Sequence, residues 1–243
     1  MSSTFGRVFR VTTFGESHGV GVGAVVDGCP AGIRVDVAGI QHQLDRRRPG
    51  QSALATPRNE PDRVSVLSGL QDDRTIGSPI AMIVENSDQR PDDYSDMSSI
   101  PRPSHADYTY WMKYGCRVRS GGGRASARET IGRVAAGALA DNLLATFGME
   151  VVAWVDSVGD VAMSPVDEKT ITRADVDAPL VRCPDPKAAA DMIALIEQAL
   201  HEHDSIGGVM TCVCRGVPPG LGEPVFDKLD VMLAHAMLSI PAV

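Results

Sequence analysis

A glycine-bounded turn near the start of the chain most restricts what it can fold into. The pentapeptide G-E-S-H-G at residues 15–19 lies between two apolar runs, Val8–Phe14 and Val20–Val26. Glycines on both sides let the backbone reverse sharply and let a ligand approach it. Glycine alternates with valine and alanine in the second run, which disfavours a helix and predicts a strand. We therefore expect a β-hairpin with Ser17 and His18 at its tip.

This turn has a catalytic and a non-catalytic interpretation. G-x-S-x-G also matches the nucleophile elbow of an α/β-hydrolase, but that elbow needs a helix after the serine and several strands before it. A hairpin turn without chemistry is the other alternative. A hydroxyl beside an imidazole, however, can give or take a proton near neutral pH. Ser17 and His18 are therefore candidate catalytic residues.

Composition restricts the class of protein. The length of 243 residues suits one large domain or two small ones. No run of ~18 apolar residues predicts a membrane span, and the N-terminus has no apolar signal core. Five scattered cysteines do not form a disulfide framework, so we expect a cytoplasmic protein, with an organelle as the alternative.

One group of residues suggests zinc. His201 and His203 lie two apart at the end of a predicted helix and diverge. Cys212 and Cys214 fit a strand with both side chains inward. We therefore expect no metal site.

Charge is unevenly distributed. Residues 1–139 hold 17 basic and 15 acidic residues, whereas residues 140–243 hold 6 basic and 16 acidic residues. The chain has 19 arginines and 4 lysines, and 13 of the arginines fall between residues 46 and 133. Arginine pairs bidentately with phosphate and carboxylate, although a biased genome would produce the same ratio. With a net charge of -8 and no basic helix, we expect an anionic small-molecule partner and no nucleic acid.

Apolar periodicity predicts an α+β fold. The expected strands are Gly6–Thr13, Val20–Asp27, Arg63–Leu67, Pro79–Glu85, Glu150–Val158 and Val209–Arg215. The expected helices are Val37–Arg47, Asp107–Tyr114, Ser126–Phe147, Pro186–His203 and Pro224–Leu238. The strands gather early and do not alternate with helices, which argues against a doubly wound sheet. No linker divides the chain, so we expect one domain over 1–243.

A second glycine cluster precedes the best-defined helix. Ser126 and Glu129 form the S-x-x-E pattern of a capping box, so the helix is predicted to begin at Ser126. The preceding S-G-G-G-R-A at 120–125, with Arg124 and Arg128, predicts an anion site made by bare backbone N–H groups. No strand precedes the glycines and no Gly-Lys-Ser/Thr follows, which excludes a Rossmann fingerprint and a P-loop. A plain flexible loop is the alternative.

A third motif, R-P-S-H-A-D-Y at 102–108, supplies another loop histidine. His105 ends a polar loop, and Asp107 is expected to cap the helix that follows. Two loop histidines, the arginine-rich 46–50 stretch and the glycine-rich helix start together predict acid–base chemistry on a polyanionic substrate.

These motifs together resemble the chorismate synthase family. The resemblance rests on residues 15–19, 45–50, 102–107, 121–130, 204–208 and 216–224, and it runs in register from Phe5 to Val243. It implies a β-α-β sandwich and usually a homotetramer. It also implies trans-1,4 elimination of phosphate from 5-enolpyruvylshikimate 3-phosphate to give chorismate. The family needs reduced FMN, which is not consumed overall, and NADPH is also implied if the chain reduces its own flavin.

The resemblance also assigns roles by motif. It implies that His18 protonates the departing phosphate, that His105 holds a proton at the flavin N1/C2-carbonyl edge, and that Ser17 and Ser126 relay a proton. The residues implied to grip substrate anions are Arg47, Arg48, Arg102 and Arg128. Those implied to line FMN are Arg124, Ala125, Ser126, Pro241 and Ala242.

Two departures from the family pattern matter. Ala53 stands where the family usually has an arginine, and Arg58 is the candidate replacement. The family continues for about a hundred residues more, so we expect a form that is short at the C-terminus and that leaves an apolar face of 231–240 unpaired. We expect 243 residues alone to bind FMN poorly and to turn over slowly. The alternative function is a catalytically impaired form that binds phosphorylated ligand weakly.

Overall fold

The computed structural model describes residues 3–52, 54, 58–87, 100–116 and 122–243. The chain divides into two compact units. The first comprises Met1–Pro49, Arg58–Leu143 and Gly220–Val243, and the second comprises Gly50–Pro57 and Leu144–Pro219. Helices and antiparallel sheets occur in both, which confirms the α+β class. The single domain over 1–243 stays a prediction.

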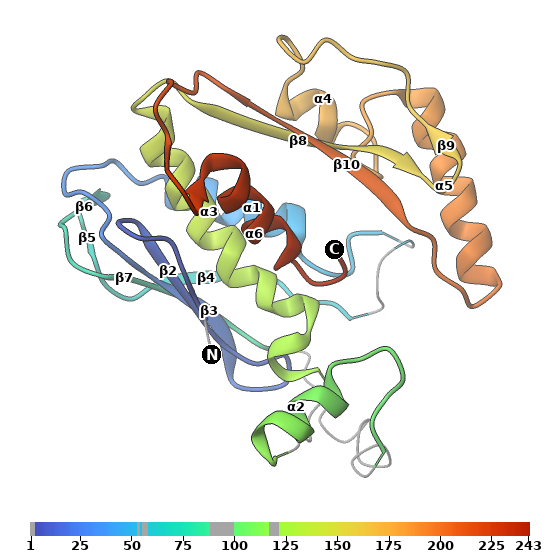
Figure 1. The fold of residues 1–243 in the computed structure, drawn as a ribbon, viewed down its shortest axis with the longest axis horizontal. Coiled ribbons are helices and arrows are strands. Elements are labelled where there is room, and N and C mark those ends of the chain that lie inside the picture. Colours follow the sequence, from blue (N-terminus) through green and yellow to red (C-terminus); the bar gives the residue numbers. More distant parts are fainter. Residues whose placement is uncertain (1–2, 53, 55–57, 88–99, 117–121) are drawn as a thin grey trace. The chain divides into compact units, whose positions relative to one another are not determined.

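The first unit is built on a five-stranded antiparallel sheet in the order β1-β2-β3-β7-β4 (Figure 1). Its strands are β1 (Thr4–Phe5), β2 (Arg10–Gly15), β3 (Gly21–Asp27), β4 (Val64–Val66) and β7 (Ile80–Glu85). Gly15 pairs with Val22, so β2 and β3 form the predicted hairpin with residues 16–20 at its tip. β2 begins later than expected because Gly6, at φ +95°, turns the chain before it.

One face of this sheet forms the main core. Val22, Ala24 and Val26 of β3 are each at most 1% exposed, which confirms the predicted strand face. Ile40 and Leu44 of α1 (Val37–Arg47) and the apolar stripe of α3 (Thr130–Ala145) cover that face. The alternate residues of β3 and the helically spaced apolar residues of α3 thus pack against one another in a single core.

Shorter elements complete the first unit. α2 (Asp107–Tyr114) follows the R-P-S-H-A-D motif, and two 3-10 turns, η2 (Gly123–Ala125) and η3 (Ala127–Glu129), lead into α3. Two small ribbons are β5 (Leu70–Gln71) with β6 (Arg74–Thr75), and β11 (Gly222–Glu223) with β12 (Asp227–Lys228). α6 (Leu229–Leu238) starts after the second ribbon, so the expected start at residue 224 was wrong. The apolar face that the sequence predicts to be unpaired is largely exposed. The exposed fraction is 40–72% at Val231, Leu233, Met237, Leu238 and Ile240.

The second unit has a three-stranded antiparallel sheet in the order β10-β8-β9. Its elements are β8 (Glu150–Val158), β9 (Val161–Ala162), α4 (Arg173–Asp177), α5 (Pro186–His201) and β10 (Gly208–Arg215). Asp185 caps α5 by accepting two backbone hydrogen bonds, with Pro186 at the first helical position. Cys212 and Cys214 lie on the exposed face of β10, so the prediction of inward side chains was wrong. Val213, between them, packs against the core instead.

None of the helices in the described ranges has the length and hydropathy of a membrane span.

The approach of α3 to the sheet depends on a glycine. A Cβ added to Gly132 would lie 2.6 Å from the carbonyl oxygen of Gly23 and 2.9 Å from Cγ2 of Thr13. Both distances are shorter than van der Waals contact, and one partner is backbone that cannot rotate away. Gly137, on the exposed side of the same helix, has no atom within 4 Å of such a Cβ.

We predict opposite effects of the same substitution at these two positions. Gly132→Ala should destabilise the protein by ~1–3 kcal/mol, because the added methyl group overpacks the α3–sheet contact. Gly137→Ala should stabilise it by ~0.5–1 kcal/mol, because alanine favours the helix. Urea unfolding of both variants measures this. Equal changes in the free energy of unfolding would show that α3 does not press on β3 at Gly132.

Candidate active site

The tip of the β2–β3 hairpin is held from two directions. The Ser17 side chain is buried, with the residue 4% exposed, and its N–H donates to the carbonyl oxygen of Gly123, 3.4 Å away. The amide of Asn86 donates to two carbonyl oxygens of the turn, those of Glu16 at 3.0 Å and Gly19 at 2.7 Å. His18 is half-buried within this turn. The loop that carries Ser17 and His18 is therefore fixed although it lies outside the sheet.

His105 lies in an ionic triad. Its Nδ1 is 2.6 Å from Oδ1 of Asp107, and Arg102 Nη2 is 3.1 Å from the same nitrogen. Arg102 Nε also donates to Asp107 at 2.8 Å. The hydrogen bonds from Arg102, with the charges of His105 and Arg102, lower the pKa of Asp107 to about 2. The expected cap is wrong, because the carboxylate of Asp107 binds these side chains and not the helix N-terminus.

The glycine-rich segment brings three of the four predicted catalytic residues together. A Cβ on Gly122 would lie 3.3 Å from Nε2 of His105 and 3.2 Å from Cβ of Ser126. The next residue, Gly123, accepts the N–H of Ser17. A methyl group at this position would crowd both side chains, so glycine suits the close approach of His105. Ser17, His105 and Ser126 thus surround two consecutive glycines.

The start of α3 differs from the predicted capping box. Ser126 Oγ accepts from the N–H of Arg128 at 3.3 Å, and the carboxylate of Glu129 accepts from Thr13 Oγ1 at 2.7 Å and Arg133 Nε at 2.8 Å. The Glu129 carboxylate therefore binds the sheet and α3 and does not cap the helix. α3 begins at Thr130, four residues later than the sequence predicts.

Some backbone N–H groups of the predicted anion site are already bonded. The N–H groups of Ala125, Arg128 and Glu129 all bond within the segment, so they are not bare as the sequence suggested. Residues 120 and 121 lie outside the described residues. Positive charge at this segment comes from the guanidinium groups of Arg124 and Arg128.

Arg124 is held by the β2 strand, and α3, which follows this segment, is linked to the end of the chain. Arg124 donates to Thr13 Oγ1 at 2.7 Å and to the carbonyl oxygen of Gly15 at 3.3 Å. From α3, Arg133 donates to Ser239 through its hydroxyl at 2.6 Å and its carbonyl at 2.9 Å. Pro241 and Ala242 follow two residues later, with Ala242 at φ +70°.

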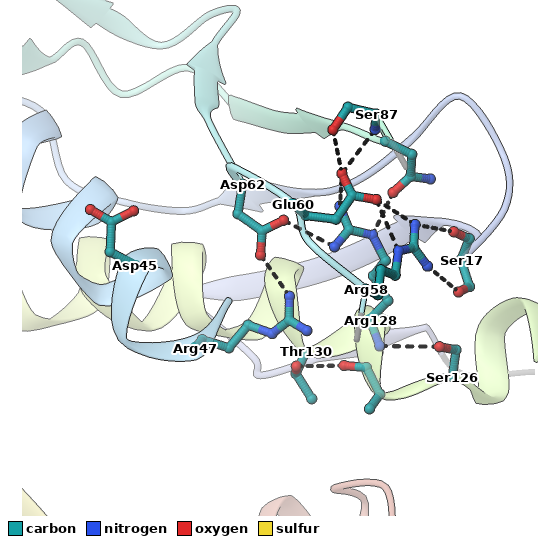
Figure 2. Close-up of polar contacts among 12 residues, drawn as sticks. Ser17, Asp45, Arg47, Arg58, Glu60, Asp62, Ser87, Ser126, Arg128 and Thr130 are labelled. Atoms are coloured by element: carbon teal, nitrogen blue, oxygen red, sulfur yellow. Dashed lines mark hydrogen bonds and ion pairs between the residues drawn. The ribbon is translucent and has the colours of Figure 1, made fainter. Parts of the chain in front are cut away.

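Two carboxylates that the sequence analysis missed organise the arginines. Asp62 is fully buried and accepts from Arg47 Nη1 and from Arg128 Nη1, each at 2.9 Å. Glu60, also fully buried, lies 3.8 Å from Nη2 of Arg128 and binds Arg58 at 2.6 Å. Figure 2 shows these five side chains pointing toward one another. Two of the predicted substrate arginines, 47 and 128, therefore share one carboxylate.

A pattern in the sequence could have revealed this cluster. Arg58, Glu60 and Asp62 occupy alternate positions of the segment that leads into β4. The intervening Asn59 and Pro61 are exposed, whereas Glu60 and Asp62 are buried. Buried carboxylates are unusual, because a buried charge needs a partner of opposite charge. Two acidic residues at alternate positions beside an arginine therefore indicate a cluster of ion pairs.

The cluster carries surplus positive charge. Three guanidinium groups face two carboxylates among these five residues. Arg128 is 3% exposed, and its Nη2 has no hydrogen-bond partner among the described residues. Burial lowers the pKa of Arg47, the charge of Asp62 opposes this, and the charges of Arg128 and Arg58 add to the lowering.

The other predicted anion contacts lie apart from Asp62. Arg48 is half-buried directly after α1, and its N–H donates to the carbonyl oxygen of Leu44. Arg102 lies beside His105. Arg58 binds Glu60 and Ser17, and Ala53 lies outside the described residues. No group of three or more His, Cys, Asp or Glu suited to a metal occurs within the described ranges.

We predict that Glu60 contributes stability that acid removes. Burial alone would raise the pKa of Glu60, but hydrogen bonds from Ser87 and Arg58 and the charge of Arg128 lower it to about 2. A lowered pKa stabilises the fold above the ordinary value of 4.5, and this contribution is lost as pH falls toward 2. The free-energy difference between wild type and Glu60→Gln should therefore shrink, by on the order of 3 kcal/mol, between pH 5 and pH 2.

Chemical unfolding at a series of pH values measures that difference. The exposed Glu197 provides a control, because Glu197→Gln should give a difference that stays nearly constant. If the free energies of unfolding of wild type and Glu60→Gln differed as much near pH 2 as at pH 7, the prediction would be contradicted.

Comparison with known proteins adds the family. A family model described as chorismate synthase matches residues 9–243. The chain is 59% identical to chorismate synthase of Akkermansia muciniphila, over 100% of this chain and 67% of that protein. It is 54% identical to chorismate synthase of Prochlorococcus marinus strain MIT 9301, over 100% of this chain and 66% of that protein. A crystal structure of chorismate synthase superposes with a TM-score of 0.73 at 30% identity, over 97% of this chain and 67% of that chain.

These matches confirm the chorismate-synthase-like fold over the region compared. The chain spans about two thirds of the length of the curated relatives it matches. The match includes every segment that surrounds Gly122 and Asp62, because it extends without interruption from residue 9 to residue 243. The chain belongs to the chorismate synthase family.

Proposed function

We propose that this chain carries the acid–base and anion-binding part of a chorismate synthase. The reaction is trans-1,4 elimination of phosphate from 5-enolpyruvylshikimate 3-phosphate to give chorismate, a carbon–oxygen lyase reaction. The observation that carries the proposal is the meeting of Ser17, His105 and Ser126 around two glycines, in the same unit as a buried arginine cluster with surplus positive charge.

Each group has a task that its chemistry suits. The elimination breaks one C–O bond to phosphate and one C–H bond, so the departing dianion must be paired and protonated. Guanidinium groups of Arg47, Arg48, Arg102 and Arg128 pair the substrate anions, because arginine presents a fork of N–H donors. Ser17 and Ser126 relay a proton, and His18 protonates the departing phosphate. Asp107 keeps His105 oriented through the short contact to Nδ1.

The residues present fit reduced FMN. Arg124, Ala125 and Ser126, together with Pro241 and Ala242, would hold it, and His105 would face the flavin N1/C2-carbonyl edge. Gly122, Gly123, Ala125 and Ser126 have small side chains, and the guanidinium group of Arg124 suits the anionic form of the reduced flavin. When bound, the reduced flavin supplies an electron-rich ring that the reaction does not consume overall. The chain's own residues bind it, orient it and hold a proton beside it.

Further properties of the family belong to the same proposal. We infer a homo-oligomer, a tetramer in the family, a cytoplasmic location, and NADPH as reductant if the chain reduces its own flavin. The second candidate function is an impaired form that binds phosphorylated ligand weakly. The apolar residues of α6 that are exposed in the described part of the chain favour it. Phosphate release with reduced FMN separates the two functions.

We predict that both histidines are needed for turnover. General acid–base groups typically contribute ~10²–10⁴-fold each. His18→Ala and His105→Ala should each lower the rate of phosphate release by that factor, measured anaerobically with reduced FMN. His201→Ala, an exposed histidine at the end of α5, serves as the control. Rates for the site variants within a few-fold of wild type would refute the assignment.

We predict that Arg102 helps to bind an anionic shikimate derivative. Calorimetry should show that Arg102→Ala weakens binding of 5-enolpyruvylshikimate 3-phosphate at least tenfold, and that added salt weakens it in the wild type. Arg63→Ala removes the same charge from an exposed side chain and should change affinity little. Tighter binding of single-stranded DNA than of the phosphorylated substrate would contradict the proposed class of ligand.

A further inference from the structure

Glu60 has the most completely fixed carboxylate of the cluster. It is fully buried, and both of its oxygens accept hydrogen bonds. Oε1 accepts from Arg58 Nε at 2.9 Å and Nη2 at 2.6 Å. Oε2 accepts from Ser87, through its N–H at 2.9 Å and its hydroxyl at 2.7 Å. With a pKa of about 2, the group is an anion at neutral pH. Ser87, at the end of β7, thus holds the carboxylate in one orientation.

Arg58 transmits that orientation to Ser17. Its Nη1 donates to Ser17 Oγ at 3.1 Å, and its Nη2 donates to the Ser17 carbonyl oxygen at 3.0 Å. The guanidinium group is planar, so the Glu60 contacts on Nε and Nη2 fix the direction of Nη1. Figure 2 shows Arg58 between Glu60 and Ser17. The carboxylate of Glu60, bound at one edge of the guanidinium group, therefore sets the position from which Arg58 donates to the Ser17 hydroxyl.

The hydrogen bond from Arg58 determines what the Ser17 hydroxyl can do. A hydroxyl has one proton and two acceptor lone pairs. Because Arg58 donates to the oxygen, the serine proton must point elsewhere. A cationic donor also withdraws electron density from the oxygen, which makes the hydroxyl a better proton donor. Ser17 is next to His18 in the chain, and its N–H is tied to Gly123 beside the His105 site.

We propose that Glu60 is a positioning residue for proton transfer at Ser17, acting through Arg58. This inference rests on the proposed function, because the proton transferred is that of the elimination reaction. Glu60 itself touches neither substrate nor cofactor. It keeps Arg58 aligned, and Arg58 keeps the Ser17 hydroxyl oriented as a donor.

A double-mutant cycle tests the coupling. Glu60→Gln keeps the shape but removes the charge, and it should lower kcat for phosphate release at least tenfold while KM changes less than threefold. In a Ser17→Ala background the same change should lower kcat less than twofold further, because its target is gone. Asp45→Asn, a carboxylate that Figure 2 shows outside the hydrogen-bonded cluster, should leave kcat unchanged. Independent effects of the Glu60 and Ser17 changes would overturn the proposal.

A second measurement separates this proposal from the proposed function. If the wild-type protein releases no phosphate, the proposed function fails, and the positioning is then read from amide resonances. Glu60→Gln and Arg58→Lys should both shift the ¹H–¹⁵N signals of Ser17, His18 and Gly19, whereas Asp45→Asn should not. Shifts confined to the direct neighbours of Glu60, with the signals of residues 17–19 unmoved, would overturn the positioning role whether or not the protein is active.

Discussion

The first unit depends on two carboxylates buried among arginines. Asp62 joins Arg47 of α1 to Arg128 at the start of α3, and Glu60 joins Arg58 to the end of β7. Removing one member of such a buried pair leaves an uncompensated charge, which typically costs ~3–5 kcal/mol. The left-handed backbone at Asp62, φ +45°, is consistent with a carboxylate placed for its partners. Ion pairs therefore connect α1 and the start of α3 through Asp62, and Arg58 connects Glu60 to the hairpin tip at Ser17.

Apolar packing sets the frame within which those charges meet. The buried face of β3 and the stripe of α3 approach closely at Gly132, and Thr13 of β2 reaches Glu129 across the same contact. This contact brings the glycine-rich segment before α3 against the hairpin tip, where Gly123 accepts the N–H of Ser17. A shift of α3 would therefore move Ser126 and Arg128 relative to Ser17.

The arrangement favours preorganisation. An active site for a phosphorylated substrate needs cations that stay in place before the substrate arrives, because reorientation during the reaction raises the barrier. Asp62 and Glu60 hold three arginines without neutralising them all, and one N–H of Arg128 is left unpaired among the described residues. The same carboxylates that stabilise the fold thus hold the arginines in fixed positions.

Local features were readable from the sequence because they depend on neighbours in the chain. Alternation along 22–26 and helical spacing along 131–143 predicted β3 and α3, and the G-E-S-H-G and R-P-S-H-A-D motifs identified His18 and His105. The roles of Glu129, Asp107 and Glu60 could not be read this way, because each carboxylate has local and distant donors to choose from. Glu129 bonds Thr13, 116 positions away in sequence, and Arg133 instead of capping its own helix. The sequence by itself determined the longer strands and helices and supplied the candidate catalytic residues. Only the tertiary structure decided which charge pairs with which, because buried ion pairs form between whichever groups the packed core brings within hydrogen-bond distance.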